Sequence, residues 1–153
     1  MLELYHIVNA LIPSAEAFTG TVQTVPINLK NFEHVSFVIQ CGAGAVGTAA
    51  VTVEACSDTT PTTLVAIPFV YQECISGDTF GAIQKAPATG FTTAAAANKV
   101  YKIDVDADVL AASGYGYIRV KSVESAVGAI SGGILAILVE PRYEQEIFDS
   151  AIV

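Results

Sequence analysis

Residues 134–139 form an uninterrupted apolar run within the segment ISGGILAILVE at 130–140. Successive side chains of a strand point to opposite faces, so a strand without a polar residue has no face suited to water. The run is also too short to cross a bilayer as a helix, which needs about 20 apolar residues. It therefore predicts a central β-strand packed on both faces. Pro141 marks its end, because proline cannot donate to a strand ladder.

The composition predicts one folded domain with apolar surface left over for another chain. A chain of 153 residues is long enough to bury a single core. Hydrophobic residues make up 52% and charged residues only 14%, with a mean hydropathy of +0.54, which is high for a monomer whose whole surface faces water. The net charge of −8 and the seven scattered Lys and Arg residues argue against nucleic acid and anionic membranes as partners. Other protein chains are the expected partners.

The N-terminal sequence and the cysteines indicate a cytoplasmic origin. MLELYHIVNALIP has no basic region before its apolar residues, so a secretory signal is poorly supported and we expect synthesis in the cytoplasm. Three cysteines cannot form a complete set of disulfides. If 35–41 and 48–57 form a hairpin, Cys41 and Cys56 lie roughly 25 Å apart, which excludes a bridge between them. Small buried thiols are the expectation.

Alternating apolar and polar residues predict a series of short strands. The glycine-rich loop at 42–47 indicates that the strands on either side of it form a hairpin. Pro26 and Pro68 place their strands at sheet edges. Turn residues recur about every 10 residues and no convincing amphipathic helix occurs, so the fold class is predicted to be all-β, a single antiparallel β-sandwich or jelly-roll-like domain. Strands are expected at 22–29, 35–41, 48–57, 64–72, 99–106, 115–123 and 130–140, with short ones near Phe80 and Phe91 and a helical turn at 108–112.

The ends of the chain are expected to be arms on this domain. Residues 1–21 keep no period for long and are interpreted as an N-terminal arm with at most one short helical or strand segment. Residues 22–141 form the sandwich domain. Residues 142–153 form an acidic tail with regularly placed large apolar residues, which is either frayed or laid on a neighbouring subunit.

The sequence CGAGAVG matches the glycine pattern of dinucleotide-binding proteins. Gly42, Gly44 and Gly47 follow a predicted strand, as that pattern requires. The pattern also requires a helix after the last glycine, whereas TAAVTVEACS has the period-two alternation of a strand. A hairpin loop is therefore the preferred interpretation, and no cofactor is expected.

No arrangement of residues predicts catalysis or metal binding. Asp104, Asp106 and Asp108 resemble the start of a calcium loop, but the glycine that such a loop needs at its sixth position is Val109 here. We expect these carboxylates to share one face of a strand, to repel one another and to lie at a solvated edge, with an ion-bridged subunit contact as the alternative. His6 and His34 are the only histidines, and no nucleophile motif accompanies them. The protein is thus not expected to be an enzyme.

Three stretches together resemble a family of viral structural proteins. They are GTAAVTVEACSDTT with IPFVYQ after it, GDTFGAIQKAPATGFTT, and YKIDVDADVLAASGYGYIRVKSVESAVGAISGGILAILVEPRY. In this order they are similar to the small head decoration, or capsid-stabilising, proteins of tailed bacteriophages and prophages, over roughly residues 22–143. The resemblance implies a β-rich subunit on the outer surface of the virion capsid. Its implied partners are the major capsid protein lattice and sister copies in a homo-oligomer. The resemblance carries no functional residues.

Apolar residues near both ends are the candidate intersubunit contacts. A subunit that decorates a lattice gains from many weak contacts repeated over it. We expect deletion of residues 1–12 or 144–153 to leave a folded core that no longer occupies capsids. The candidate contacts are Leu2, Leu4, Tyr5, Ile7, Ile147, Phe148 and Ile152.

Three alternative functions remain open. The first is another virion component, such as a tail tube or connector protein. The second is a carbohydrate-binding sandwich that uses Tyr115 and Tyr117 as an aromatic platform, although such tyrosines usually cover sheet neighbours. The least favoured is a nucleotide-binding enzyme that uses Gly42, Gly44 and Gly47.

Overall fold

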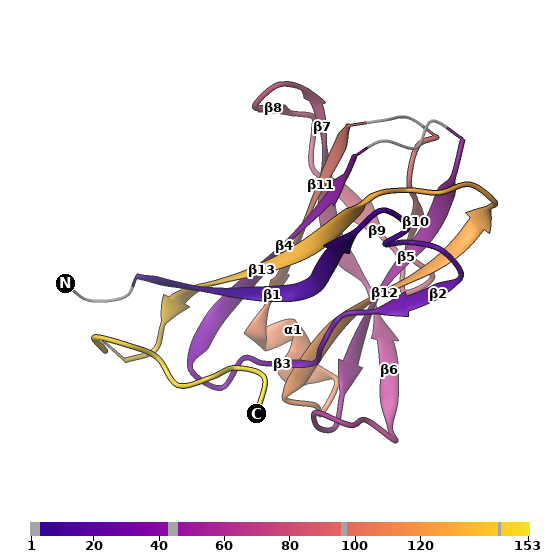
Figure 1. Cartoon of the computed structure of the whole chain (residues 1–153). Coiled ribbons are helices and arrows are strands. Elements are labelled where there is room, and N and C mark those ends of the chain that lie inside the picture. The colour runs from indigo at the N-terminus through magenta and orange to yellow at the C-terminus, as the bar shows by residue number, and fades with distance from the viewer. Residues whose placement is uncertain (1–3, 43–45, 96–97, 144) are drawn as a thin grey trace.

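The chain forms two antiparallel β-sheets packed face to face (Figure 1). The structure is a computed structural model, and it describes residues 4–42, 46–95, 98–143 and 145–153. This arrangement confirms the predicted all-β sandwich. The first sheet has the strand order β1 (Tyr5–Ser14), β13 (Gly132–Pro141), β4 (Phe32–Cys41), β11 (Lys99–Asp106), β7 (Phe69–Ser76) and β8 (Thr79–Phe80), with β9 (Gln84–Ala86) also pairing with β7. The second has the order β10 (Phe91–Thr92), β5 (Thr48–Cys56), β12 (Tyr117–Ala126) and β2 (Thr21–Gln23), with β3 (Ile27–Asn28) on β12 and β6 (Leu64–Ile67) on β5.

A single hydrophobic core lies between the sheets. Period-two alternation points one face of each long strand into this core and the other face away from it. Helix α1 (Ala107–Ala112) follows β11 and contributes the buried Leu110. The central side chains of the core are Val35, Phe37 and Ile39 on β4, Val51 and Val53 on β5, Tyr101, Ile103 and Val105 on β11, Ile118 and Val120 on β12, and Ile134, Ala136 and Leu138 on β13.

Strand β13 lies inside the first sheet, as the apolar run predicts, between β1 and β4. Its inner side chains Ile134, Ala136 and Leu138 are buried. The prediction that both faces are covered is wrong within this chain, because Leu135 on the outer face is 43% exposed. Ile137 beside it is only partly buried. The sheet has one other sheet to pack against, so the described residues leave its outer face partly uncovered.

The predicted hairpin of β4 and β5 is wrong. β4 pairs with β13 and β11 in the first sheet, whereas β5 pairs with β12, β10 and β6 in the second. The two strands therefore lie in different sheets. Alternation shows which face of a strand meets the core, and both strands do meet it, from opposite sides. It does not identify the neighbour to which a strand bonds.

Pro26 and Pro68, which were expected to mark edge strands, each lie between two strands. Pro26 separates β2 from β3, and both short strands lie at one edge of the second sheet, on β12. Pro68 separates β6 at the opposite edge of that sheet from β7 in the first sheet. The expected strand at 64–72 is thus two strands in different sheets, because proline cannot donate to a continuous ladder.

Both ends of the chain belong to the folded domain. Residues 5–14, which the sequence assigned to an arm, form strand β1, paired with β13 along its length. At the other end, Asn28 N–H donates to the Ala151 carbonyl over 2.8 Å, which holds the C-terminal segment beside β3 (Figure 1). Deletion of residues 1–12 would remove most of a sheet strand, so an intact core is no longer expected from it.

The three cysteines are free thiols. Cys41 and Cys56 are buried, as expected of small apolar side chains, and Cys74 is partly buried. Burial raises the pKa of both Cys41 and Cys56 to about 11. These two thiols are therefore protonated at neutral pH and poor nucleophiles.

Candidate interaction surface

The outer face of the first sheet carries a strip of apolar side chains from three neighbouring strands. Tyr5 and Ile7 on the edge strand β1 are 56% and 54% exposed. Cross-strand pairing sets Tyr5 opposite Val139, and Ile7 opposite Ile137. Because pairs on one face of a sheet lie side by side, these residues form one continuous surface. This outer strip comprises Tyr5, Ile7, Val38, Leu135, Ile137 and Val139.

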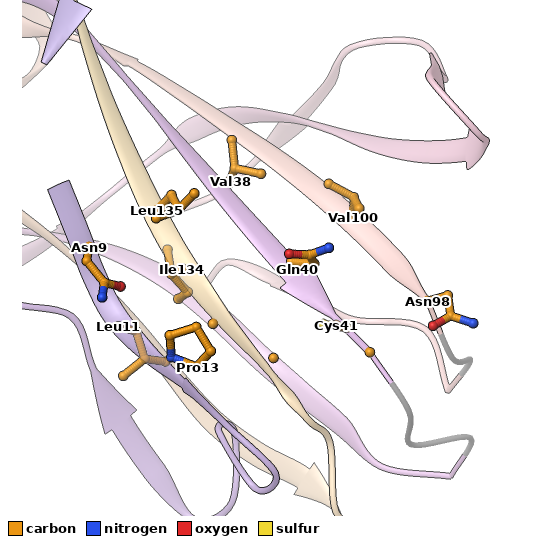
Figure 2. Close-up of a pocket in the computed structure, with 13 residues that line it drawn as sticks. Asn9, Leu11, Pro13, Val38, Gln40, Cys41, Asn98, Val100, Ile134 and Leu135 are labelled. Atoms are coloured by element: carbon orange, nitrogen blue, oxygen red, sulfur yellow. The ribbon is translucent and has the colours of Figure 1, made fainter. Parts of the chain in front are cut away.

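A pocket of about 290 Å³ continues the outer strip at the end of β13 that begins with Gly132 (Figure 2). Gly133 forms part of its floor, opposite Gln40 on β4. A Cβ atom on Gly133 would lie 2.9 Å from Pro13 Cγ and 3.0 Å from the Leu11 carbonyl oxygen, so a larger residue would crowd the β1 backbone. The side chains around the pocket are mainly apolar, including Leu11, Pro13, Val38, Val100, Ile134 and Leu135. Its size suits one or two apolar side chains.

A polar cluster borders the outer strip on β4 and β11. His34 lies between two carboxylates, with Nδ1 2.7 Å from Asp106 Oδ1 and Nε2 3.2 Å from Asp104 Oδ1. The Ser36 hydroxyl also donates to Asp104. Lys102 Nζ lies 3.1 Å from the second oxygen of Asp104. Cross-strand pairing of His34 with Asp106 and of Ser36 with Asp104 creates this cluster. Sequence analysis missed it because its residues on β4 and those on β11 are about 70 positions apart in the chain.

The carboxylates favour the doubly protonated form of His34. Each ring nitrogen faces an acceptor, and only the imidazolium can donate to both at once. The hydrogen bond with Asp104 raises the pKa of His34, burial opposes it, and the bond with Asp106 adds to the increase. Burial alone would raise the pKa of Asp104, but hydrogen bonds from His34, Ser36 and Lys102 outweigh it and lower that pKa to about 2. The expected repulsion between these aspartates is thus offset by cations.

Ser36, His34 and Asp106 have the order of a hydrolase triad but not its working geometry. Ser36 Oγ lies 3.4 Å from His34 Nε2, yet its proton is directed to Asp104. Ser36 is also buried on a strand that pairs on both sides, so the backbone N–H groups around it serve the sheet and none is positioned to stabilise an oxyanion. The cluster therefore holds two strands together and supplies charge beside the outer strip.

The residues predicted to make intersubunit contacts lie in different parts of the structure. Leu4, Tyr5 and Ile7 are exposed on or beside β1, and Tyr5 and Ile7 belong to the outer strip. Ile147 and Ile152 are exposed in the C-terminal segment and do not belong to the outer strip. Leu2 lies outside the described residues. The outward residues of β4 and β13 were missed, although the unbroken apolar run of β13 contained the signal.

Phe148 is a core residue and not a surface contact. It is 5% exposed, and its ring centroid lies 4.6 Å from that of Phe32 and 6.4 Å from that of His6. The prediction treated every large apolar residue of the tail alike. The tail instead turns this one ring inward and leaves its neighbour Ile147 in solvent.

The other sequence motifs take no part in this surface. Strand β5 begins directly after Gly47, so the helix that a dinucleotide-binding loop requires is absent there; Gly44 lies outside the described residues. Tyr115 packs against the core and Tyr117 is partly buried on β12, which leaves no open aromatic platform at this pair. Asp108 lies in α1 and not on the strand of Asp104 and Asp106.

The described residues were also compared with the requirements of metal sites and membrane-spanning helices. No group of three His, Cys, Asp or Glu side chains in the described ranges is arranged to hold a metal ion. Helical structure there is confined to the six residues of α1, and no helix has the length and hydrophobicity to span a membrane.

Comparison with known proteins gives little more. No protein-family model and no curated protein matches the chain. Among solved structures, the SPBc2 prophage-derived protein YomS is similar over 92% of this chain and 96% of its own, at 11% identity and a TM-score of 0.48. A similarity of this size identifies neither a family nor a function.

Proposed function

We propose that this protein is a structural virion protein of a tailed bacteriophage, and specifically a head decoration protein that binds the outer surface of the capsid lattice. The observation that carries the proposal is the outer strip, an apolar surface that the described residues leave partly exposed. Neighbouring strands of one rigid sheet present it, so binding it to another protein requires little reordering of the backbone. The resemblance of residues 22–143 to head decoration proteins supports the same role.

The charges of the chain support a protein partner over nucleic acid or a membrane. Lys99 and Lys102 form ion pairs with Glu73 and Asp104 on the first sheet. Arg119 and Lys121 share Glu54 on the second. These four cations are paired with carboxylates and spread over both sheets, so they do not form the basic patch that phosphate binding requires. Capsid proteins and sister copies are the proposed partners.

The outer strip is proposed as the capsid-facing surface, with the pocket beside Gly133 as its anchor point. Leu135 lies in both the strip and the pocket, opposite Val38 on β4. An apolar side chain of the capsid protein that entered this pocket would bury Leu135 and Val38 together. Contacts of this kind, buried at the centre of an interface, supply most of its binding energy.

Co-sedimentation with capsids tests this proposal. Purified protein is added to mature capsids of the encoding phage that lack it, and bound copies are counted against concentration. We expect saturable binding with a fixed ratio to the capsid protein. Leu135→Ser should weaken binding at least about tenfold, because it removes a contact from the interface centre. Val127→Ser changes a side chain that is 90% exposed outside the strip, and it should bind as the parent does.

The same assay can contradict the proposal. Absence of binding to mature capsids would overturn it, and binding to purified tails instead would favour a tail or connector component. Equal loss of binding in Leu135→Ser and Val127→Ser would show that the outer strip is not the contact surface. Thermal unfolding of each variant checks that both are folded.

A further inference from the structure

Strand β1 ends the first sheet, and its outer side offers backbone groups for another strand. It pairs with β13 on one side and stands last in the strand order. Among the described residues, the backbone hydrogen bond that reaches it from outside β13 joins Val25 N–H to the Ala10 carbonyl over 3.1 Å. The part of β1 before Ala10, including Ile7 and Asn9, precedes that contact. A strand edge of this kind can pair with a further strand.

The first half of β1 lacks the charged side chains, prolines and bulges by which proteins usually protect such an edge. Exposed edges are commonly protected by charged side chains, especially lysine, or by proline. The residues of β1, YHIVNALIPS, include no Lys, Arg, Asp or Glu, and the proline comes only at position 13. Register shifts between Asn9 and Leu11, and between Leu11 and Ser14, disturb only its later half. Its first half is regular, carries no Lys, Arg, Asp or Glu, and presents Tyr5, Ile7 and the polar Asn9 on the outer face.

We propose that β1 pairs antiparallel with β1 of a second copy about a two-fold axis, so that the two first sheets become one continuous sheet. Antiparallel pairing of a strand with itself is self-complementary, as a two-fold contact requires. It would also bring the two outer strips together, because Tyr5 and Ile7 lie at the β1 border of each strip. The proposal deepens the proposed function by stating how sister copies meet, and it rests on that function only for its place on a capsid.

Charge favours a second copy as the occupant of this edge. Two chains that each carry a net charge of −8 repel at most surfaces. The uncharged β1 is a place where they can align without opposing like charges, which are destabilising when directly opposite on paired strands. The acidic side chains of the sheet lie on the strands behind β1, with Glu140 near the end of β13, Glu33 near the start of β4, and Asp104 and Asp106 on β11.

The oligomeric state of the purified full chain tests the proposal without any capsid. Mass is measured by analytical ultracentrifugation over a dilution series for the parent, Ile7→Lys and Ile75→Lys. Ile7→Lys puts a charge on the proposed edge, whereas Ile75 is a similarly exposed isoleucine on β7, at the other side of the sheet. We expect a dimer, or an even-numbered assembly of dimers, for the parent and for Ile75→Lys. Ile7→Lys should raise the dimer dissociation constant at least about tenfold. Tyr5→Lys serves as a second edge variant.

Amide hydrogen exchange separates strand pairing from a contact of side chains alone. The amides of β1 before Ala10 should become protected as concentration rises, and Ile7→Lys should abolish that change. A parent that stays monomeric, an odd-numbered closed ring, or a dimer without added protection in β1 would each overturn the proposal. A monomer that still binds capsids would overturn it and leave the proposed function standing. A dimer with protected β1 amides that does not bind capsids would support the strand pairing and overturn the proposed function.

Discussion

The rings of Phe148 and Phe32 pack together with their centroids 4.6 Å apart and their planes at 52°. Phe32 begins β4 at the centre of the first sheet, whereas Phe148 lies in the last six residues of the chain. The His6 ring joins them, with its centroid 6.1 Å from that of Phe32. This cluster ties both ends of the chain to the same corner of the sandwich.

Loss of the Phe148 ring should therefore destabilise the whole domain. Phe148→Ala leaves a cavity beside Phe32 and is expected to lower the free energy of unfolding by about 3–5 kcal/mol. Ile147→Ala is the matched control, because Ile147 is 82% exposed, and it should change stability by less than about 0.5 kcal/mol. Urea denaturation of both variants measures the difference. Equal, small effects would show that the tail is not part of the core in solution.

The sequence predicts strands and their faces well but not how the strands are arranged. Residues 99–106 were predicted as a strand from their alternation, and β11 has those bounds and buries every second side chain from Tyr101 to Val105. Alternation is a local property, so it survives without tertiary information. Whether β4 bonds to β5 or to β13 depends on contacts far apart in the chain, and alternation is the same in either case.

The candidate surface was predicted only in part for a related reason. An apolar residue can face the core or another protein, and composition does not distinguish the two. Tyr5 and Phe148 are both large apolar residues near a chain end, yet Tyr5 is exposed and Phe148 is buried. Similarly, the run at 134–139 showed that two apolar faces exist. It could not show that the chain supplies a cover for only one.

Removing one partner of the ion pair between Glu54 and Arg119 should destabilise the fold strongly, because the other charge is then left buried and unpaired. Glu54 Oε2 lies 2.7 Å from Arg119 Nε, and both side chains are largely buried between β5 and β12. Glu54→Gln leaves the guanidinium without a counter-charge on that side and is expected to cost about 3 kcal/mol. Glu33→Gln breaks the more exposed pair with Arg142 and should cost less than about 1 kcal/mol. Thermal unfolding compares Glu54→Gln with Glu33→Gln. Equal losses of stability would contradict the burial of Glu54 and Arg119.

Gly90 should tolerate substitution far less than Gly114, although both have left-handed backbone conformations. Their φ values are +79° and +82°, so alanine is strained at either position by roughly 1–2 kcal/mol. A Cβ on Gly90 would also clash with the Val51 carbonyl oxygen, whereas nothing lies within 4 Å of one on Gly114. Gly90→Ala is therefore expected to lose more stability than Gly114→Ala in chemical denaturation. The reverse order would mean that the loop before β10 does not pack on β5 in this way.

The His34 cluster should make the free energy of unfolding depend on pH, in the direction set by the pKa shifts of His34 and Asp104. The folded-state pKa of His34 is raised above its ordinary value of 6.5, so folding favours the imidazolium. Its contribution is fully present below pH 6.5 and is lost as the pH rises through the folded-state pKa. Asp104 contributes in the opposite sense, because its folded-state pKa is lowered to about 2, and its stabilisation is lost only as the pH falls from 3.8 towards that value.

Comparison of the parent with His34→Gln across pH isolates the histidine. The parent should exceed the variant in free energy of unfolding most clearly at about pH 5, where Asp104 is still ionised, and the difference should shrink by about pH 9. Titration of the His34 ring by NMR gives its pKa directly, with His6 as the internal comparison in the same spectrum. A pKa for His34 below 6.5, or a stability difference that grows with pH, would show that the ring does not lie between two carboxylates in solution. The same titration on capsid-bound protein would then report whether binding at the neighbouring outer strip changes the charge of this cluster.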